Sequence, residues 1–156
     1  RDDEIDRQYF LLVRLIRSTM VDKRLAGLFN LENIDILDYR IAANLLETGG
    51  DTIVELANSL ATTSLSKTDL KKIYSITKDI ETIHKKSIDA FIDNNRSLAI
   101  EAINLHRKYQ QKSSDIRSSS EQKTQAPIDF LDLIYLFERV ERCWADIADL
   151  VKPVYK

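Results

Sequence analysis

The sequence predicts an all-α fold, an up-down antiparallel helical bundle of about five long helices. The first observation behind this prediction is the scarcity of chain breakers: the 156 residues include three glycines and two prolines, and residues 51 to 126 contain neither. β-Turns and the Gly-rich loops of α/β folds need such residues. The second is that apolar residues recur every three or four positions, the period of an amphipathic helix.

Composition excludes several classes of protein. Lys and Arg number 23 against 25 Asp and Glu, so the chain lacks the basic surplus that broad nucleic-acid binding requires. No apolar run approaches the ~20 residues of a membrane span. The single cysteine, Cys143, excludes an internal disulfide framework and suits a reducing compartment. We therefore expect a cytoplasmic protein that binds no nucleic acid through this stretch and does not insert into a membrane.

The expected helices follow from their apolar stripes and caps. The first runs from about residue 3 to 20, and residues 21–32 form a connector with at most one short helical turn. Asn33 is the expected N-cap of a second helix that ends near Leu60. Ser66 and Asp69 fit a capping box that starts the third helix. The further helices are expected over 67–93, 97–117 and 127–151, and the polar segment 118–126 is expected to be a flexible loop.

Two alignments within the chain indicate a two-copy helical repeat. Residues 5–18 align with 105–118, and residues 38–60 align with 129–151, in the same order. The matched pairs include Tyr9 with Tyr109, Ile16 with Ile116, Tyr39 with Phe130, Glu47 with Glu138 and Leu56 with Ile147. We therefore expect a single domain over 1–156, with the last two helices of copy one in 1–60 and all three helices of copy two in 67–152. The leading helix of copy one would precede Arg1.

The second expected helix carries the most unusual pattern. Glu47, Asp51 and Glu55 follow one another at intervals of four, so the three carboxylates share one helix face. Gly49 and Gly50 lie between them, each costing about 1 kcal/mol relative to Ala inside a helix. Glycine lets a backbone or an ion approach closely, and hard cations take carboxylate oxygens. A solvated acidic face with a glycine kink is the alternative.

No enzymatic motif is complete, so we expect no catalytic residues. Glu81 and His84 match half of a di-iron Glu-x-x-His pair, but His106 has no glutamate three residues before it. The chain holds no zinc pattern, P-loop or nucleophile elbow. On the last helix, Arg142 stands between Glu138 and Asp146, and this cation would oppose metal binding there.

The stretches Glu4 to Arg17 and Asp38 to Asn58 resemble the PhoU-like regulators of phosphate uptake. The family's third helix carries Leu-Glu-Arg-Ile-Gly-Asp followed by Asn-Ile-Ala-Glu. The matching positions here are Leu46, Glu47, Gly50, Asp51, Glu55 and Ala57, and in the second copy Glu138, Arg139, Val140, Ile147 and Ala148. The second copy departs from the family signature at two positions, where Glu141 replaces Gly and Arg142 replaces the metal-binding Asp. The opening segment looks most like archaeal members in which an AbrB-like DNA-binding domain precedes the repeats.

The resemblance implies metal binding on acidic bundle faces, with Mg, Mn, Fe or Zn as the ion. The candidate ligands are Glu47, Asp51, Glu55, Glu81 and Glu138. It also implies a regulatory adaptor of phosphate homeostasis, whose partners are components of a phosphate ABC transporter or a sensor kinase. Two alternatives remain open, namely the sensory or dimerising half of an AbrB-type transcription regulator and a metal-free helical scaffold. Because copy one lacks a helix here, we expect an apolar face to be left uncovered. We therefore expect either a homo-oligomer or association of this face with the missing segment.

Overall fold

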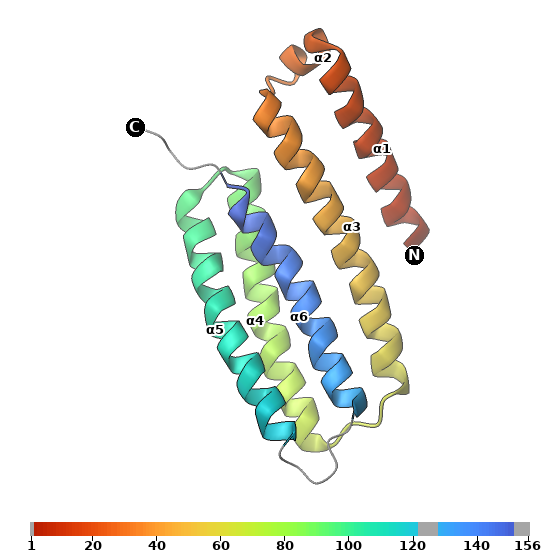
Figure 1. Cartoon of the computed structure of the whole chain (residues 1–156), viewed down its shortest axis with the longest axis vertical. Helices are drawn as coiled ribbons and strands as arrows, with labels where there is room; N and C mark the ends of the chain where they lie inside the picture. The colour runs from red at the N-terminus through yellow and green to blue at the C-terminus, as the bar shows by residue number, and fades with distance from the viewer. Residues whose placement is uncertain (1, 122–127, 152–156) are drawn as a thin grey trace. The chain divides into compact units, whose positions relative to one another are not determined.

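The computed structural model describes residues 2–121 and 128–151, and this part of the chain is almost entirely helical (Figure 1). It contains no strand, which confirms the all-α prediction. The helices are α1 (Asp2–Val21), α2 (Lys23–Leu28), α3 (Asn33–Thr62), α4 (Lys67–Ile92), α5 (Arg96–Glu121) and α6 (Ile128–Asp149). The five long helices are those expected, and α2 is a short helix inside the predicted connector. None of the described helices combines the length and the apolar character of a membrane span.

The chain divides into two compact units, Arg1–Asp51 (unit 1) and Thr52–Lys156 (unit 2). The border falls inside α3, whereas the sequence placed the junction between its two copies in the segment 61–66. Helix α3 runs unbroken across the border because no helix-breaking residue follows Asp51 before the polar segment ATTSLS. The two-copy repeat itself stays a prediction, and each unit is described by itself below.

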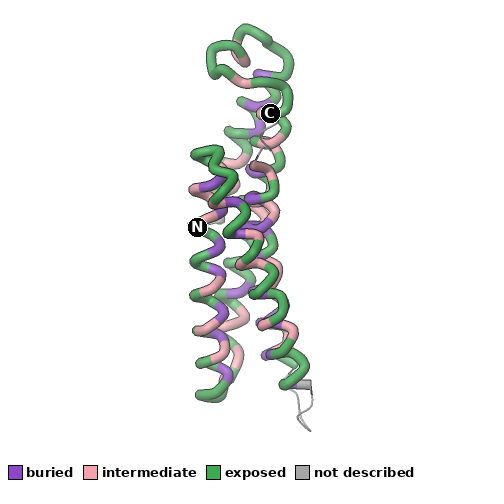
Figure 2. The backbone as a smooth tube through the Cα atoms, turned by 90° about the vertical axis from the view of Figure 1, so that its left-hand side faces the viewer, coloured by how far each residue is buried: buried purple, intermediate pink, exposed green. Residues whose placement is uncertain are grey.

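In unit 1, α1 and the first part of α3 run antiparallel. The Tyr9 hydroxyl of α1 lies 3.5 Å from Asn44 Oδ1 of α3, and the Ile5 side chain of α1 reaches Gly50 of α3. Residues earlier in α1 thus meet residues later in α3, as in an αα-hairpin. Figure 2 shows the end of unit 1 that holds α2 as mostly exposed.

Helix α2 and the start of α3 are set by local caps. The Asp22 side chain accepts a hydrogen bond from the Arg24 N–H, and Asn30, at φ 52°, ends α2. The Leu31 N–H then bonds to the Ala26 carbonyl, as in a Schellman motif. The prediction that Asn33 caps α3 is wrong, because Asn33 is already helical. Instead the Asp35 carboxylate reaches back and accepts from the Glu32 N–H at 2.8 Å.

In unit 2, helices α4, α5 and α6 pack around one core. More than half of the residues of α6 are buried, so this helix is apolar on most of its circumference. Helix α4 contributes a single stripe whose main members are Ile73, Ile76, Ile80 and Ile83. Its start is the predicted one, since the Ser66 hydroxyl accepts from the Asp69 N–H and caps the helix.

Helix α5 continues beyond its expected end. The polar segment from residue 118 was expected to leave the helix, but the described residues stay helical to Glu121. The Ser119 and Ser120 hydroxyls donate to the Ile116 carbonyl, so these side chains bond within the helix instead of competing with it. The remainder of the expected loop, 122–127, lies outside the described residues, as does Pro153.

The connection between α4 and α5 depends on two asparagines. Asn94 adopts φ 47°, and the Asn95 N–H bonds to the Ala90 carbonyl at 2.8 Å, which closes a Schellman motif. The Asn95 side chain then accepts from the Ser97 and Leu98 N–H groups and caps α5. One short sequence therefore ends one helix and starts the next.

We expect Asn94→Ala to lower the free energy of unfolding by about 1 kcal/mol, because a left-handed backbone is costly for a residue with an ordinary Cβ. Asn94→Gly should leave stability unchanged or raise it. Urea unfolding monitored by circular dichroism measures both variants. Equal destabilisation by the two substitutions would contradict this account and assign the effect to the Asn94 side chain.

Candidate metal centre

Three carboxylates from two helices of unit 1 come together. Asp6 of α1 meets Glu47 and Asp51 of α3, and one oxygen from each lies within 4.8 Å of the others. Asp6 and Glu47 are half-buried, and Asp51 is exposed. This is the only such group of potential metal ligands among the described residues.

The helix geometry explains the cluster. Glu47 and Asp51 are one turn apart on α3, which puts both carboxylates on one face, as predicted. The antiparallel course of α1 brings Asp6 to the same level. A Cβ on Gly50 would stand 3.3 Å from Ile5 Cδ1, so the missing side chain leaves room for Ile5, the neighbour of Asp6. The glycine that looked costly in the sequence is thus explained by the approach of α1.

The separation of the three oxygens fits one cation. Ca²⁺ binds oxygen at about 2.4 Å and Mg²⁺ at about 2.1 Å, so ligands on opposite sides of an ion lie about 4 to 5 Å apart. The spacing in the cluster is within this limit. All donors are carboxylate oxygens, which suits hard ions such as Mg²⁺, Mn²⁺ or Ca²⁺ better than Zn²⁺.

The other candidate ligands named from the sequence lie elsewhere and are not grouped with a third donor in the described residues. In unit 2, Glu55 forms an ion pair with Arg139 at 2.9 Å. Glu138 accepts from the Ser113 hydroxyl at 2.6 Å and lies 3.4 Å from the Arg117 guanidinium. Glu81 is an exposed residue of α4. Arg142 pairs with Asp146 at 3.2 Å within α6.

Sequence reasoning missed Asp6 as a candidate. Its position could be found only from the register of α1 on α3, which no local pattern encodes. A weak signal existed, because Asp6 directly follows Ile5, a member of the apolar stripe that faces α3.

A buried contact between a histidine and a glutamate of unit 2 was also missed. His106 Nδ1 of α5 lies 2.8 and 2.9 Å from the two carboxylate oxygens of Glu141 of α6, and Glu141 is 1% exposed. Burial raises the pKa of Glu141, and His106 opposes the shift. Burial and the nearby Glu141 and Glu138 carboxylates also raise the pKa of Tyr109, and Ser113 opposes the shift.

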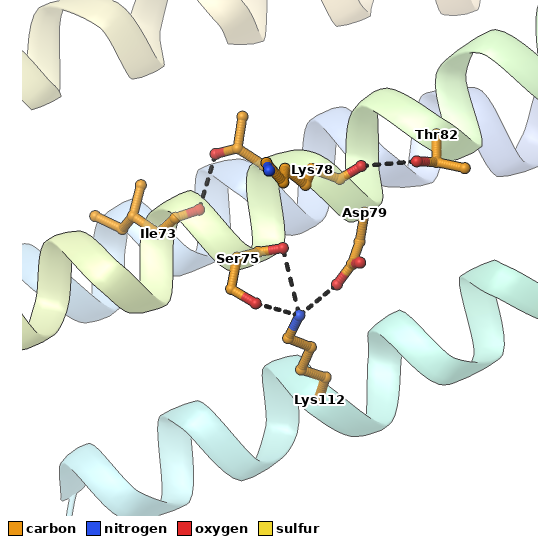
Figure 3. A network of polar contacts seen from close by, with 7 residues as sticks. Ile73, Ser75, Lys78, Asp79, Thr82 and Lys112 are labelled. Atoms are coloured by element: carbon orange, nitrogen blue, oxygen red, sulfur yellow. Dashed lines mark hydrogen bonds and ion pairs between the residues drawn. The ribbon is translucent and has the colours of Figure 1, made fainter.

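Basic side chains of α4 and α5 are engaged in contacts between these helices. Lys112 of α5 donates to the carbonyl and hydroxyl of Ser75 and to the carboxylate of Asp79, both on α4 (Figure 3). Lys86 of α4 pairs with Glu101 of α5 at 2.7 Å. These lysines tie the two helices together.

Comparisons of the chain with protein-family models, with curated proteins and with solved structures found no match.

We expect Glu141 to make the stability of the protein depend on pH. A raised pKa means that the folded protein holds the proton more tightly than the unfolded chain does. The resulting stabilisation is complete below the ordinary carboxyl pKa, near 4.5, and is lost as pH rises through the raised pKa. Glu141→Gln removes this dependence. Its free energy of unfolding should match the wild type in acid and exceed it at neutral pH.

Urea unfolding at several values between about pH 4 and about pH 8 tests this prediction. Glu101→Gln is the matched control, because Glu101 makes an exposed ion pair with a lysine of the neighbouring helix. The Glu101→Gln variant loses this ion pair, so it should not exceed the wild type in stability at neutral pH. A curve for Glu141→Gln that runs parallel to the wild-type curve would contradict the prediction.

Proposed function

We propose that this protein is a regulatory adaptor that acts through its helix surfaces and is tuned by a bound divalent cation. The observation that carries the proposal is the convergence of Asp6, Glu47 and Asp51 from two helices on a point that one ion can reach. The resemblance of the Leu46 to Asp51 segment to the PhoU signature supports phosphate uptake as the regulated process.

The three carboxylates would hold the cation between α1 and α3. In the absence of an ion, their like charges oppose the close approach of the two helices. A bound cation converts this repulsion into an attraction and fixes α1 against α3. Three protein oxygens leave further positions for water, as is usual for Mg²⁺ and Mn²⁺. The chemistry is therefore structural, and the partner would recognise the arrangement of the two helices.

Isosteric substitutions of the three carboxylates test whether a cation binds to them. We expect Mn²⁺ or Mg²⁺ to raise the midpoint of thermal unfolding of the wild type, because an ion at 100 times its Kd stabilises by about 2.7 kcal/mol. Asp6→Asn, Glu47→Gln and Asp51→Asn should each abolish that increase. In chelator the same variants should be as stable as the wild type or slightly more stable, because repulsion is relieved.

Asp3→Asn is the matched control, because Asp3 is an exposed carboxylate of α1 outside the cluster. It should keep the full response to the cation. Glu81→Gln should keep it too, since Glu81 lies on α4. Elemental analysis of chelator-free protein gives the occupancy. An identical response in the wild type and the Glu47→Gln variant would refute the site and leave a metal-free scaffold.

The regulatory role requires a separate experiment. Deletion of the gene in the source organism should change phosphate uptake and phosphate-dependent transcription, and Glu47→Gln should restore the wild-type response only in part. A deletion with no phosphate phenotype, together with no binding to transporter or sensor-kinase components, would refute the role in phosphate regulation without affecting the cation site.

A further inference from the structure

Unit 1 exposes much of its apolar surface. Fourteen of the 22 large hydrophobic side chains that are exposed in the described structure belong to it, although it is the smaller unit. They include Phe10, Leu11 and Leu15 on α1 and Leu37 and Leu46 on α3. Monomers rarely keep contiguous apolar patches of this kind.

Several of these residues, among them Leu11, Leu15 and Leu46, line a groove along α1 and α3. Two adjoining hollows, of about 590 and 250 Å³, share Leu12 and Leu15 of α1. The larger one also takes in Leu11 and Leu46, and the smaller one takes in Phe29 and Tyr39. The groove therefore follows most of the length of α1.

Unit 2 shows how a stripe of large apolar residues along one helix is covered by a neighbouring helix. Phe130, Phe137 and Trp144 recur every seven residues along α6 and are 1%, 4% and 7% exposed. Their partner is α4, because the rings of Trp144 and His84 are 4.4 Å apart and Lys72 lies over the Phe130 ring. A third helix thus closes the face that α5 leaves open.

Unit 1 has the stripe without the third helix. In the sequence alignment of the two copies, Tyr39 corresponds to Phe130 and Leu46 to Phe137. These two residues are 44% and 42% exposed, whereas their counterparts in unit 2 are 1% and 4% exposed. What α4 covers in unit 2 is open in unit 1.

We propose that a second copy of this chain covers the groove, with the α1–α3 hairpins of the two copies packed face to face as a four-helix bundle. The contact is isologous, so each copy buries the same surface. Two helical hairpins with apolar faces close a complete core in this way. The proposal does not depend on phosphate regulation, and it uses the carboxylate cluster only for its charge.

The charges of α1 favour a dimer in which the α1 helices of the two copies run antiparallel to each other. Acidic residues dominate its first turns, where Asp3, Glu4 and Asp6 lie with Arg7 as the single base. The later half carries Arg14 and Arg17 and no acid. A two-fold axis near the middle of α1 puts each acidic half beside the basic half of the partner helix. A parallel arrangement would place the two acidic ends, each with its carboxylate cluster, side by side.

The size of the face is sufficient for a stable dimer. Helix α1 has 20 residues and is about 30 Å long. Two helices side by side are about 20 Å wide, so each copy offers about 600 Å² and the pair about 1,200 Å². This area reaches the lower limit of stable, specific interfaces, about 1,200 to 2,000 Å².

Sedimentation velocity and light scattering over a wide range of concentration test the proposal with the full chain. The wild type should be a dimer. The substitution Leu15→Glu, in the middle of the groove, should raise the dissociation constant of the dimer at least tenfold. Tyr74→Glu is the matched control, since Tyr74 is an exposed apolar residue of α4 in unit 2. It should leave the dimer intact. Circular dichroism verifies that both variants are folded.

Disulfide trapping gives an independent result if Leu15→Glu fails to fold. In a Cys143→Ala background, Leu11→Cys lies near the two-fold axis and should form a covalent dimer on mild oxidation, while Tyr74→Cys should not. A wild type that stays monomeric at the highest concentration would overturn the proposal, as would equal cross-linking by the two cysteine variants. A monomer would leave the groove to the leading helix of copy one, which the alignment places before Arg1, or to a different protein.

Discussion

A helix whose apolar stripe is wide cannot bury it against one neighbour, and this constraint determines the architecture of both units. Helix α6 shows the satisfied case, because its buried residues point toward both α4 and α5. The aromatic residues at intervals of seven face α4, and Glu141 faces α5. In unit 1 the same requirement acts on α1 and α3, and two long helices cannot meet it.

Polar groups between α5 and α6 determine how these two helices align with each other, in addition to stabilising unit 2. Glu141 is buried beside His106, and Glu138 beside Ser113 and Arg117, so α5 and α6 meet through matched donors and acceptors. A carboxylate without such a partner would cost several kcal/mol in this environment. These contacts allow one register of α5 on α6 and penalise the others. Hydrogen-bonded side chains of this kind favour one packing arrangement of the helices over other compact arrangements.

The sequence predicted what local rules determine. The start of α4 follows from Ser66, and the shared face of Glu47 and Asp51 follows from their spacing, because each depends on residues within one turn. The end of α5 was placed too early, since Ser119 and Ser120 bond to their own helix instead of ending it. Asp6 and the His106–Glu141 pair were missed because each depends on how one helix lies against another, which requires the whole unit to be assembled.

The contact of Ile5 with Gly50 also determines the axial position of α1 on α3. A slip of one turn would move Asp6 by about 5.4 Å, more than the 4.8 Å that spans the three carboxylates. The acidic cluster therefore exists only at one setting of the two helices. Any force that pulls α1 along its axis, including one exerted by a bound partner, changes how many carboxylates a single ion can reach. With the proposed cation bound, sliding of α1 along α3 would lower the ion affinity, and the ion would in turn resist the sliding.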